Sequence, residues 1–515
     1  DNVSDSRAQQ LEEAHARLQQ ENKLLKEKID LLLQPTFGQS SEKVSPDQLD
    51  FLMNNPEALG KPASGDSPKT EEAAAKPKQR RRKRKPRLPE YLPIESSKEL
   101  IPQEVLDSPE HWKRIGQEIT EQLHYHPGHF SKKQLIRPKY VSLLDRDAPP
   151  IIAPLPNQWT ERGIATPGLQ AHIAIGKYVD HLPLYRQEQI FKTRYGVHIP
   201  RNTMSRWMDQ VAQSLKLIYL CMAEQLFTGD YLQVDETPIK YLKPGSGKAQ
   251  QGYFWCYSNP KGDVIYDWQT SRGHECLLHM LQRPNQTDPT QPTLYYRGIL
   301  QCDGYSAYET LARKVPGIQL AGCMAHVRRK FKEALQHSPT QALWIIVQIK
   351  HLYRIERKLS NQNAGPRYRN DLRQVESRPI LARIKKALLI FKANASILPQ
   401  STLGRAVDYA LGQWEGLEVY LTEGRVEIDN NHAENSVRPT AVGKKNWLFI
   451  GRGDTGDRSA IIYSIVESCR RRGIDPHAYL ADVLERIPSA TNKEVSQLTP
   501  AAWAAEKQDQ HQAAA

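Results

Sequence analysis

The chain has 515 residues, enough for three to four domains at ~150 residues each, so it can bury several hydrophobic cores without disulfide bonds. Its 71 Lys and Arg residues against 58 Asp and Glu residues leave a net charge of +13, which favours a polyanion such as nucleic acid over a neutral metabolite. No apolar run approaches the ~20 residues that span a bilayer, so we expect a soluble protein, although composition alone leaves a ribosome-like or membrane-surface protein open.

The first predicted element is a short leucine zipper over residues 1–34. Leu11, Leu18, Leu25 and Leu32 repeat every seven residues, and Asn22 falls at the alternate core position of the same heptad. Leu at the d positions with one Asn at an a position favours a parallel pair of helices, so we predict a homodimer or a higher oligomer. An amphipathic helix that packs on its own chain stays the alternative, because three to four heptads are near the lower limit for independent pairing.

Residues 35–93 are predicted to form a flexible linker that carries a basic arm. The stretch is rich in Pro, Gly, Ser, Ala and charged residues. The centre of the arm is Arg80, Arg81, Arg82, Lys83, Arg84 and Lys85. Such a run neutralises DNA phosphates without reading the base sequence, and a solvated charged linker is the alternative.

Residues 94–160 are predicted to form a small module that contains β-strands, from alternating stretches at residues 119–125 and 134–142. The chain has six cysteines, scattered singly, and none of them precedes Cys221. They show neither a CxxC pair nor a Cys/His ligand spacing, so we do not expect zinc or a secreted disulfide framework. Unpaired thiols are typical of the reducing cytoplasm.

Residues 161–225 are predicted to form a helix-turn-helix DNA-binding domain. Helical spacing runs over residues 169–179, 184–194 and 202–215, and a Tyr195-Gly196 turn precedes the last helix. That last helix would be the recognition helix, and the residues that would open it toward a DNA groove are Arg201, Asn202, Thr203, Ser205 and Arg206. Three-helix units are often only structural, and this alternative stays open.

From residue 226 the pattern changes from helical to extended and predicts an α/β sheet of ribonuclease H type. Strands are predicted at residues 231–234, 253–257, 264–268, 299–301 and 318–321. The first part of this core covers residues 226–338, an all-helical insertion covers residues 339–424, and the second part covers residues 425–490, with a strand at residues 447–450. Residues 491–515 are predicted to be a poorly ordered tail.

Three carboxylates are candidates for a catalytic site. Asp235 and Asp303 each follow an apolar strand, and ligands of α/β sheets bind at strand ends. Carboxylates held close together raise one another's pKa unless a cation neutralises them, so the pair predicts metal, with Glu434 as a third member. Ordinary roles exist as well, because Asp303 before Gly304 is typical of a turn and the step from Asn431 to Glu434 has the spacing of a capping box.

The segment Ile428 to Gly451, IDNNHAENSVRPTAVGKKNWLFIG, resembles the block around the catalytic glutamate of the insertion sequence sixty-six family of bacterial DDE transposases. Residues that resemble other blocks of that family follow in the right order: 177–189, 234–238, 302–305, 325–331 and 476–484. The resemblance covers about residues 20–490. It implies Asp235, Asp303 and Glu434 as the acidic triad, and it also implies the zipper, the helix-turn-helix and the helical insertion as domains.

One feature of the family is missing from this chain. Family members generally carry a cysteine-rich, zinc-ribbon-like module where this chain has residues 94–160, which contain no Cys. The histidines that remain there are irregularly spaced and are more typical of a packed or surface module than of a zinc site. They are His111, His124, His126 and His129.

The resemblance implies a transposase that binds the terminal inverted repeats of an insertion sequence and cleaves and transfers DNA strands. The hypothesis is that the triad holds two Mg²⁺ ions ~3.5–4 Å apart, for which Mn²⁺ could substitute. Water would free a 3′-OH at the transposon end, and that hydroxyl would then attack target DNA. A DNA-binding regulator and a ribonuclease H-like nuclease are the alternatives.

Further DNA contacts and partners are expected on the same basis. The residues expected to contact DNA near the triad are His326, Arg329, Lys330, Arg438, Lys444 and Lys445. The expected partners are double-stranded DNA at the transposon ends and at the target, further copies of the chain, and accessory proteins encoded by the same element. The expected location is the bacterial cytoplasm, in association with the nucleoid.

Overall fold

The computed structural model describes residues 164–260, 262–283 and 294–514, together with isolated residues between 107 and 152. The predicted zipper, the basic arm and most of the module over residues 94–160 lie outside the described residues. Within that module the structure describes one short antiparallel pair, β1 (Lys139–Tyr140) with β2 (Ile151–Ile152). The chain divides by its internal contacts into two units, one of residues 60–136 and one of residues 1–59 and 137–515. The elements named below belong to the second unit.

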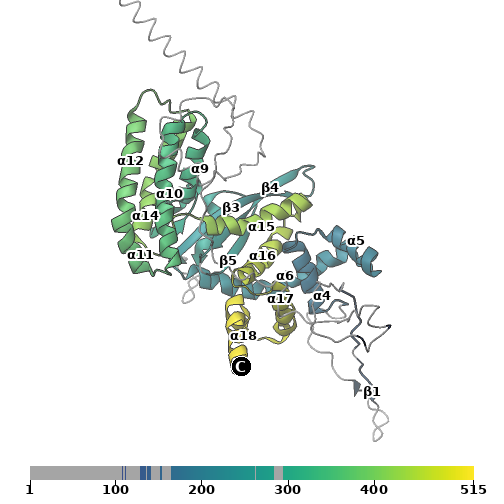
Figure 1. Ribbon diagram of the computed structural model, residues 1–515. Helices are drawn as coiled ribbons and strands as arrows, with labels where there is room; N and C mark the ends of the chain where they lie inside the picture. Colours follow the sequence, from purple (N-terminus) through teal and green to yellow (C-terminus); the bar gives the residue numbers. More distant parts are fainter. Residues whose placement is uncertain are drawn as a thin grey trace, which may run out of the picture. The chain divides into compact units, whose positions relative to one another are not determined.

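The described chain is a mixed α/β fold in which helices predominate (Figure 1). Its elements up to residue 334 are α4 (Pro167–Tyr178), α5 (Leu184–Tyr195), α6 (Arg201–Phe227), β3 (Tyr231–Leu242), β4 (Ala249–Ser258), β5 (Val264–Gln269), α7 (His274–Leu281), β6 (Gln282–Arg283), β7 (Leu294–Tyr295), β8 (Gly298–Gln301), α8 (Ser306–Lys314), β9 (Ile318–Ala321) and α9 (Met324–Ala334). Those that follow are α10 (Pro339–Asn361), α11 (Pro366–Leu372), a π-helical segment (Arg373–Ser377), α12 (Arg378–Ala393), α13 (Thr402–Gly412), α14 (Trp414–Thr422), α15 (Asn431–Trp447), β10 (Phe449–Arg452), α16 (Thr455–Arg471), α17 (Pro476–Arg486), two 3₁₀ turns (Ile487–Ser489 and Val495–Leu498) and α18 (Pro500–Ala514).

In the described part of the chain, six strands form a mixed sheet in the order β5-β4-β3-β8-β9, with β10 also on β3. β3, β4 and β5 are antiparallel to one another, whereas β8 and β9 run parallel to β3. β8 pairs with β3 only over Tyr231–Gln233, and β10 begins to pair at Lys240. Between these two contacts β3 has no described strand on that side, so the sheet opens around Asp235.

The five strands predicted for the first part of the core are present. Asp235, however, lies inside a strand and not at its end, because the antiparallel partner β4 extends β3 to Leu242. The last strand was also predicted two residues early: Trp447 still belongs to α15, and β10 begins at Phe449. Leu448, with a φ of 61°, separates the two elements.

The free edge of β5 is covered by α16. The backbone N–H groups of Val264 and Tyr266 donate to the hydroxyls of Ser468 (3.1 Å) and Ser464 (2.8 Å) on that helix. These serines satisfy donors that an edge strand would otherwise present to another chain. The contact holds α16 against the sheet.

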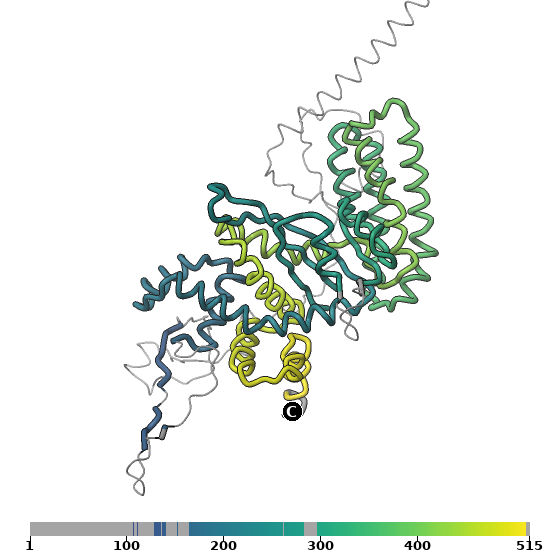
Figure 2. The backbone as a smooth tube through the Cα atoms, turned by 180° about the vertical axis from the view of Figure 1, so that it is seen from behind, coloured from purple at the N-terminus to yellow at the C-terminus, as the bar shows by residue number. Residues whose placement is uncertain are grey.

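The prediction that residues 491–515 form a poorly ordered tail is wrong, because the structure describes helix α18 within this range. Trp503 of α18 donates its indole N–H to Asp482 of α17 at 2.7 Å, and its ring packs at 5.7 Å from Tyr479. Figure 2 shows these two helices side by side. This aromatic residue, together with the ion pair between Arg486 and Glu506 (3.2 Å), anchors a segment whose composition is otherwise typical of a tail.

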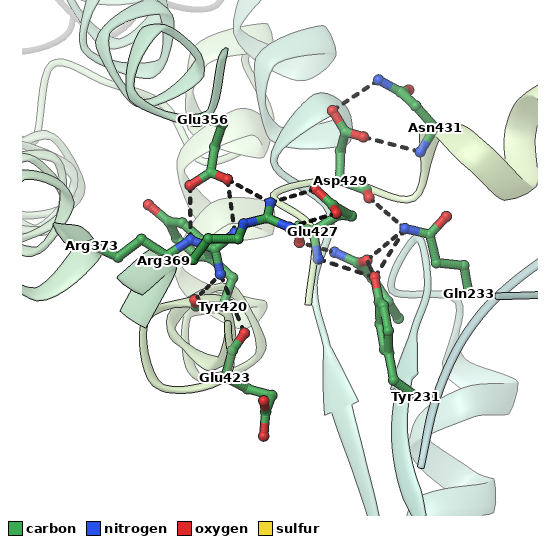
Figure 3. A network of polar contacts seen from close by, with 11 residues as sticks. Tyr231, Gln233, Glu356, Arg369, Arg373, Tyr420, Glu423, Glu427, Asp429 and Asn431 are labelled. Atoms are coloured by element: carbon green, nitrogen blue, oxygen red, sulfur yellow. Dashed lines mark hydrogen bonds and ion pairs between the residues drawn. The ribbon is translucent and has the colours of Figure 1, made fainter. Parts of the chain in front are cut away.

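Between α9 and α15 the chain forms a helical insertion, whose two clearest predicted helices are present as α10 and α12, side by side in Figure 1. Its interior includes a fully buried guanidinium. Arg373 in the π-helical segment makes two hydrogen bonds to Glu356 of α10, at 2.8 and 2.7 Å. Arg369 bridges the same carboxylate (2.9 Å) to Glu427 (2.8 Å), which lies between α14 and α15 (Figure 3).

We expect Glu356→Ala to lower the free energy of unfolding by about 3–5 kcal/mol, because it leaves the buried Arg373 without its counter-charge. Urea denaturation followed by circular dichroism measures this change. The matched control is Glu376→Ala, which removes an exposed pair with Lys358 and should cost about 0–1 kcal/mol. Equal effects in the two variants would show that the buried network does not stabilise the insertion.

Candidate active site

Asp235 lies within β3, and Asp303 lies just beyond the end of β8, the strand that runs parallel beside it. β3 and β8 pair with Gln233 opposite Gln301, and an aspartate follows each glutamine two residues later. Continued past the end of β8, this register sets Asp235 opposite Asp303. Because side chains alternate along a strand, Asp235 lies on the same face of β3 as Gln233.

The two glutamines and a tyrosine hold the segment that leads to α15 (Figure 3). Gln233 donates to the Asp429 carbonyl at 2.8 Å, and Gln301 donates to the Glu427 carbonyl at 2.8 Å. The Tyr231 hydroxyl donates to Gln301 at 2.6 Å and accepts from the Glu427 N–H at 3.1 Å. All three side chains are buried, so this set of hydrogen bonds, which we call the glutamine clamp, is shielded from water.

The clamp places Glu434 in the first turn of α15. Gln233 accepts a hydrogen bond from the Ala433 N–H at 3.2 Å, one residue before the glutamate. The Glu434 carboxylate then faces α9, where it lies 3.5 Å from His326 Nδ1 and 3.5 Å from the Arg329 guanidinium. The alternative of a capping box is wrong, because Asn430 is the N-cap residue and makes no side-chain capping bond.

The three acids belong to one electrostatic cluster. Burial raises the pKa of Asp235 well above its usual range, and the negative charges of Glu236, Glu434 and Asp303 raise that pKa further. We call Asp235, Asp303 and Glu434 the acid cluster. Like charges gathered at a partly buried point disfavour one another's ionisation, and a divalent cation is the simplest group that relieves this cost.

Asp303 has a turn function as well. One of its carboxylate oxygens accepts the Tyr305 N–H at 3.0 Å, and Gly304 between them has a φ of 84°. A Cβ at Gly304 would lie 2.6 Å from the Gln413 side chain, so only glycine fits this turn. This hydrogen bond uses one carboxylate oxygen of Asp303, so its role in the turn is compatible with a role in the site.

A fourth acid beside the cluster was missed in the sequence. Glu236 follows Asp235 directly and therefore points to the other face of β3, where its side chain is only 2% exposed. It pairs with Arg272 and accepts the Tyr308 hydroxyl at 2.6 Å. Its position next to Asp235 was the only signal in the sequence.

The structure brings some of the predicted DNA contacts to the acid cluster and not others. His326 and Arg329 lie at Glu434. Lys330 instead lies 3.9 Å from Glu333, and Lys444 donates to the Pro238 carbonyl at 3.0 Å. Arg438 and Lys445 on α15 are exposed.

The three helices predicted for the helix-turn-helix are present, although the last one, α6, continues to Phe227. Gly196 ends α5 with a φ of 66°. Near the start of α6, Arg201, Asn202 and Arg206 are exposed and Thr203 is half-buried. Ser205 faces inward, because its hydroxyl and carbonyl accept hydrogen bonds from Arg458 of α16 at 3.2 and 3.0 Å.

A Cys/His pair was also overlooked. Cys323 and His326 stand three residues apart at the start of α9, and together with Glu434 each offers one ligand atom within 4.8 Å of the other two. These three side chains could hold a metal ion, and the Cys-x-x-His spacing that supplies two of them was missed in the sequence.

Comparisons with known proteins agree over most of the chain. The family described as "Transposase IS66 family" matches residues 162–458, "IS66 C-terminal element" matches residues 464–501, and "Transposase C of IS166 homeodomain" matches residues 24–96. Two uncharacterized proteins of Sinorhizobium fredii are similar. The one called y4jD is 34% identical over 76% of this chain and 77% of its own length, and y4qI is 35% identical over 72% and 68%. Among the described helices, none has the length and apolarity to cross a membrane.

The raised pKa of Asp235 predicts a stability effect. Folding raises the pKa of this carboxyl group above its value in the unfolded chain. Between these two pKa values, from about pH 4 upward, the free energy of unfolding falls by about 1.4 kcal/mol per pH unit, because the unfolded chain releases the proton more readily. We therefore expect Asp235→Asn to raise the melting temperature at neutral pH in a chelator. Mg²⁺ should stabilise the native chain more than this variant.

Thermal denaturation with and without Mg²⁺ measures both effects. The control is Asp408→Asn on α13, whose carboxylate is about half exposed and pairs with Lys392 on the surface. If Asp235→Asn behaved like this control in both conditions, the acid cluster would not be an electrostatically strained cation site.

Proposed function

Because this chain belongs to the IS66 family of transposases, we propose that it cleaves the ends of an insertion sequence and joins them to target DNA at Asp235, Asp303 and Glu434. Membership makes the chain a DNA-modifying transposase. The proposal that these three acids catalyse the reaction rests on one observation. They come from β3, from the turn after β8 and from α15, which are far apart in the sequence, and their charges act on one another.

Divalent cations fit the acid cluster. The family is one of DDE transposases, which generally use divalent metal. The carboxylates supply the oxygen ligands that Mg²⁺ and Mn²⁺ prefer, and Glu434 Oε1 is buried without a hydrogen-bond partner among the described residues. Bound there, such cations would activate the attacking hydroxyl and stabilise the leaving 3′ oxygen.

The residues of the chain then have separate roles. Asp235 lies within β3, and Asp303 lies two residues beyond the end of β8, which pairs with β3, so the backbone of these two strands fixes where each aspartate leaves the sheet. Glu434 is added by the glutamine clamp. Arg329, which is 56% exposed, is placed to contact a DNA phosphate beside Glu434 without entering the cluster.

The sheet supports a ribonuclease H-like core. Three antiparallel strands, β3 to β5, precede two parallel strands, β8 and β9, and the helical insertion separates these from the helix that carries the last acid. This order is the one predicted from the sequence. We propose further that the exposed start of α6 contacts the terminal repeat, and that the residues 1–34 pair two copies of the chain.

We expect Asp303→Asn and Glu434→Gln each to reduce cleavage of a duplex that carries the transposon end by at least ~100-fold, because even an outer partner of a metal site contributes ~10–100-fold. Both variants should still bind the duplex. Cleavage is measured on a labelled DNA strand with Mg²⁺, and binding is measured by gel shift.

Asp408→Asn is the control and should cleave like the native chain. Retained cleavage in Asp303→Asn would remove that residue from the site. Binding without any Mg²⁺-dependent nicking by the native chain would favour the regulator. Nicking without joining of a pre-cut 3′ end to target DNA would favour the nuclease.

The exposed start of α6 predicts an electrostatic effect on DNA affinity. Arg201→Ala and Arg206→Ala should each weaken binding to the terminal repeat and reduce the slope of log K against log salt by about 1, if each guanidinium contacts one phosphate. Titrations at several salt concentrations measure the slope. Lys493→Ala, which removes an exposed charge near the end of the chain, should leave it unchanged. An unchanged slope in both arginine variants would contradict the assignment of this helix.

A further inference from the structure

A second group of potential metal ligands lies at the start of α9. Cys323 Sγ, a ring nitrogen of His326 and a carboxylate oxygen of Glu434 all lie within 4.8 Å of one another. His326 Nδ1 and Glu434 Oε1 are 3.5 Å apart. Two ligands at ~2.0–2.2 Å from a tetrahedral zinc ion are about 3.3–3.6 Å apart, so this separation fits an ion shared by the two side chains.

Two of these ligand atoms are buried without a hydrogen-bond partner. Among the described residues, neither His326 Nδ1 nor Glu434 Oε1 has one. Nearly all buried polar atoms in native proteins bond to protein, to water or to an ion. A cation between the histidine and the glutamate would give both of them a partner.

Cys323 lies at the N-terminus of α9, one helical turn before His326. It is buried and occupies the N-cap position of that helix, where its side chain makes no capping hydrogen bond. Cation binding would replace the S–H bond with a metal–sulfur bond and release the proton to solvent, and the positive end of the α9 dipole would stabilise the thiolate.

We propose that Cys323, His326 and Glu434 form a site for a thiophilic divalent cation such as Zn²⁺. A sulfur, a nitrogen and an oxygen ligand select Zn²⁺ over Mg²⁺, which prefers oxygen alone. Arg329 lies 3.4 Å from His326 Nε2 and 3.5 Å from Glu434, and it is 56% exposed. Its long side chain turns toward solvent when the ion enters.

The site shares Glu434 with the acid cluster. An ion held by Cys323 and His326 draws this carboxylate toward α9, and therefore Zn²⁺ should slow Mg²⁺-dependent cleavage. This consequence rests on the proposed function, whereas binding of the ion does not. Zinc would then act as an inhibitor of the transposase and not as its cofactor.

Cobalt(II) tests the binding site without any measurement of activity. Added to the chelator-treated full chain, Co²⁺ should produce a near-ultraviolet absorption from sulfur-to-metal charge transfer, and Zn²⁺ should abolish it. Cys323→Ala should weaken Co²⁺ binding by about 100-fold or more and remove the band. Cys276→Ala, which removes another buried thiol on α7, should keep the band. Circular dichroism checks the fold of each variant, and the near-isosteric Cys323→Ser serves if the alanine variant is unfolded.

The absence of a sulfur band, or a band that survives in both Cys323 variants, would overturn the proposal. For the inhibitory consequence, each protein is compared with its own zinc-free cleavage rate. Equal inhibition of the native chain and Cys323→Ala would refute that consequence. A sulfur band in a chain that never cleaves DNA would uphold the zinc site and refute the proposed function, so the two failures are distinguishable.

Discussion

The candidate site depends on the glutamine clamp. Gln233 and Gln301 are directly paired across β3 and β8, and with Tyr231 they bond to the backbone of residues 427–433, which the helical insertion separates from both strands along the chain. A buried amide without partners is costly, so these side chains favour one position of the segment before α15 over all others. The same strands that carry Asp235 and Asp303 therefore also determine where Glu434 lies.

The helical insertion reaches the same segment from the other side. Glu427 receives two hydrogen bonds from Arg369, at 2.9 and 2.8 Å (Figure 3). Asp429 accepts the Tyr353 hydroxyl at 2.6 Å. Asp429 also accepts the Asn431 N–H at 3.1 Å at the start of α15. The segment is thus held between sheet and insertion. The insertion therefore has a structural role, because it returns the chain from α9 to a defined point opposite β3.

Function and stability oppose each other at this point. Burial and neighbouring charges raise the pKa of Asp235, and nearby buried polar atoms of His326, Glu434 and Asn430 have no partner among the described residues. A fold selected for stability alone would avoid this arrangement. In the two proposals made above, cations would supply the missing interaction, hard ones among the carboxylates and a thiophilic one between Cys323 and Glu434. The choice of cation would then decide whether Glu434 serves the acid cluster or α9.

Periodicity in the sequence was enough to predict the strands of the first core, α5, α12 and the α17 helix, because local alternation and helical spacing record which face each element buries. Residue type and resemblance also identified Asp235, Asp303 and Glu434 as candidates. Contacts with residues distant in the sequence decided three other features. β4 determines the length of β3, Arg458 holds Ser205, and Asp482 holds α18. The meeting of Cys323 with Glu434, and of both with the glutamine clamp, likewise arises only when distant segments pack, since long-range pairing leaves no periodic signal in either segment.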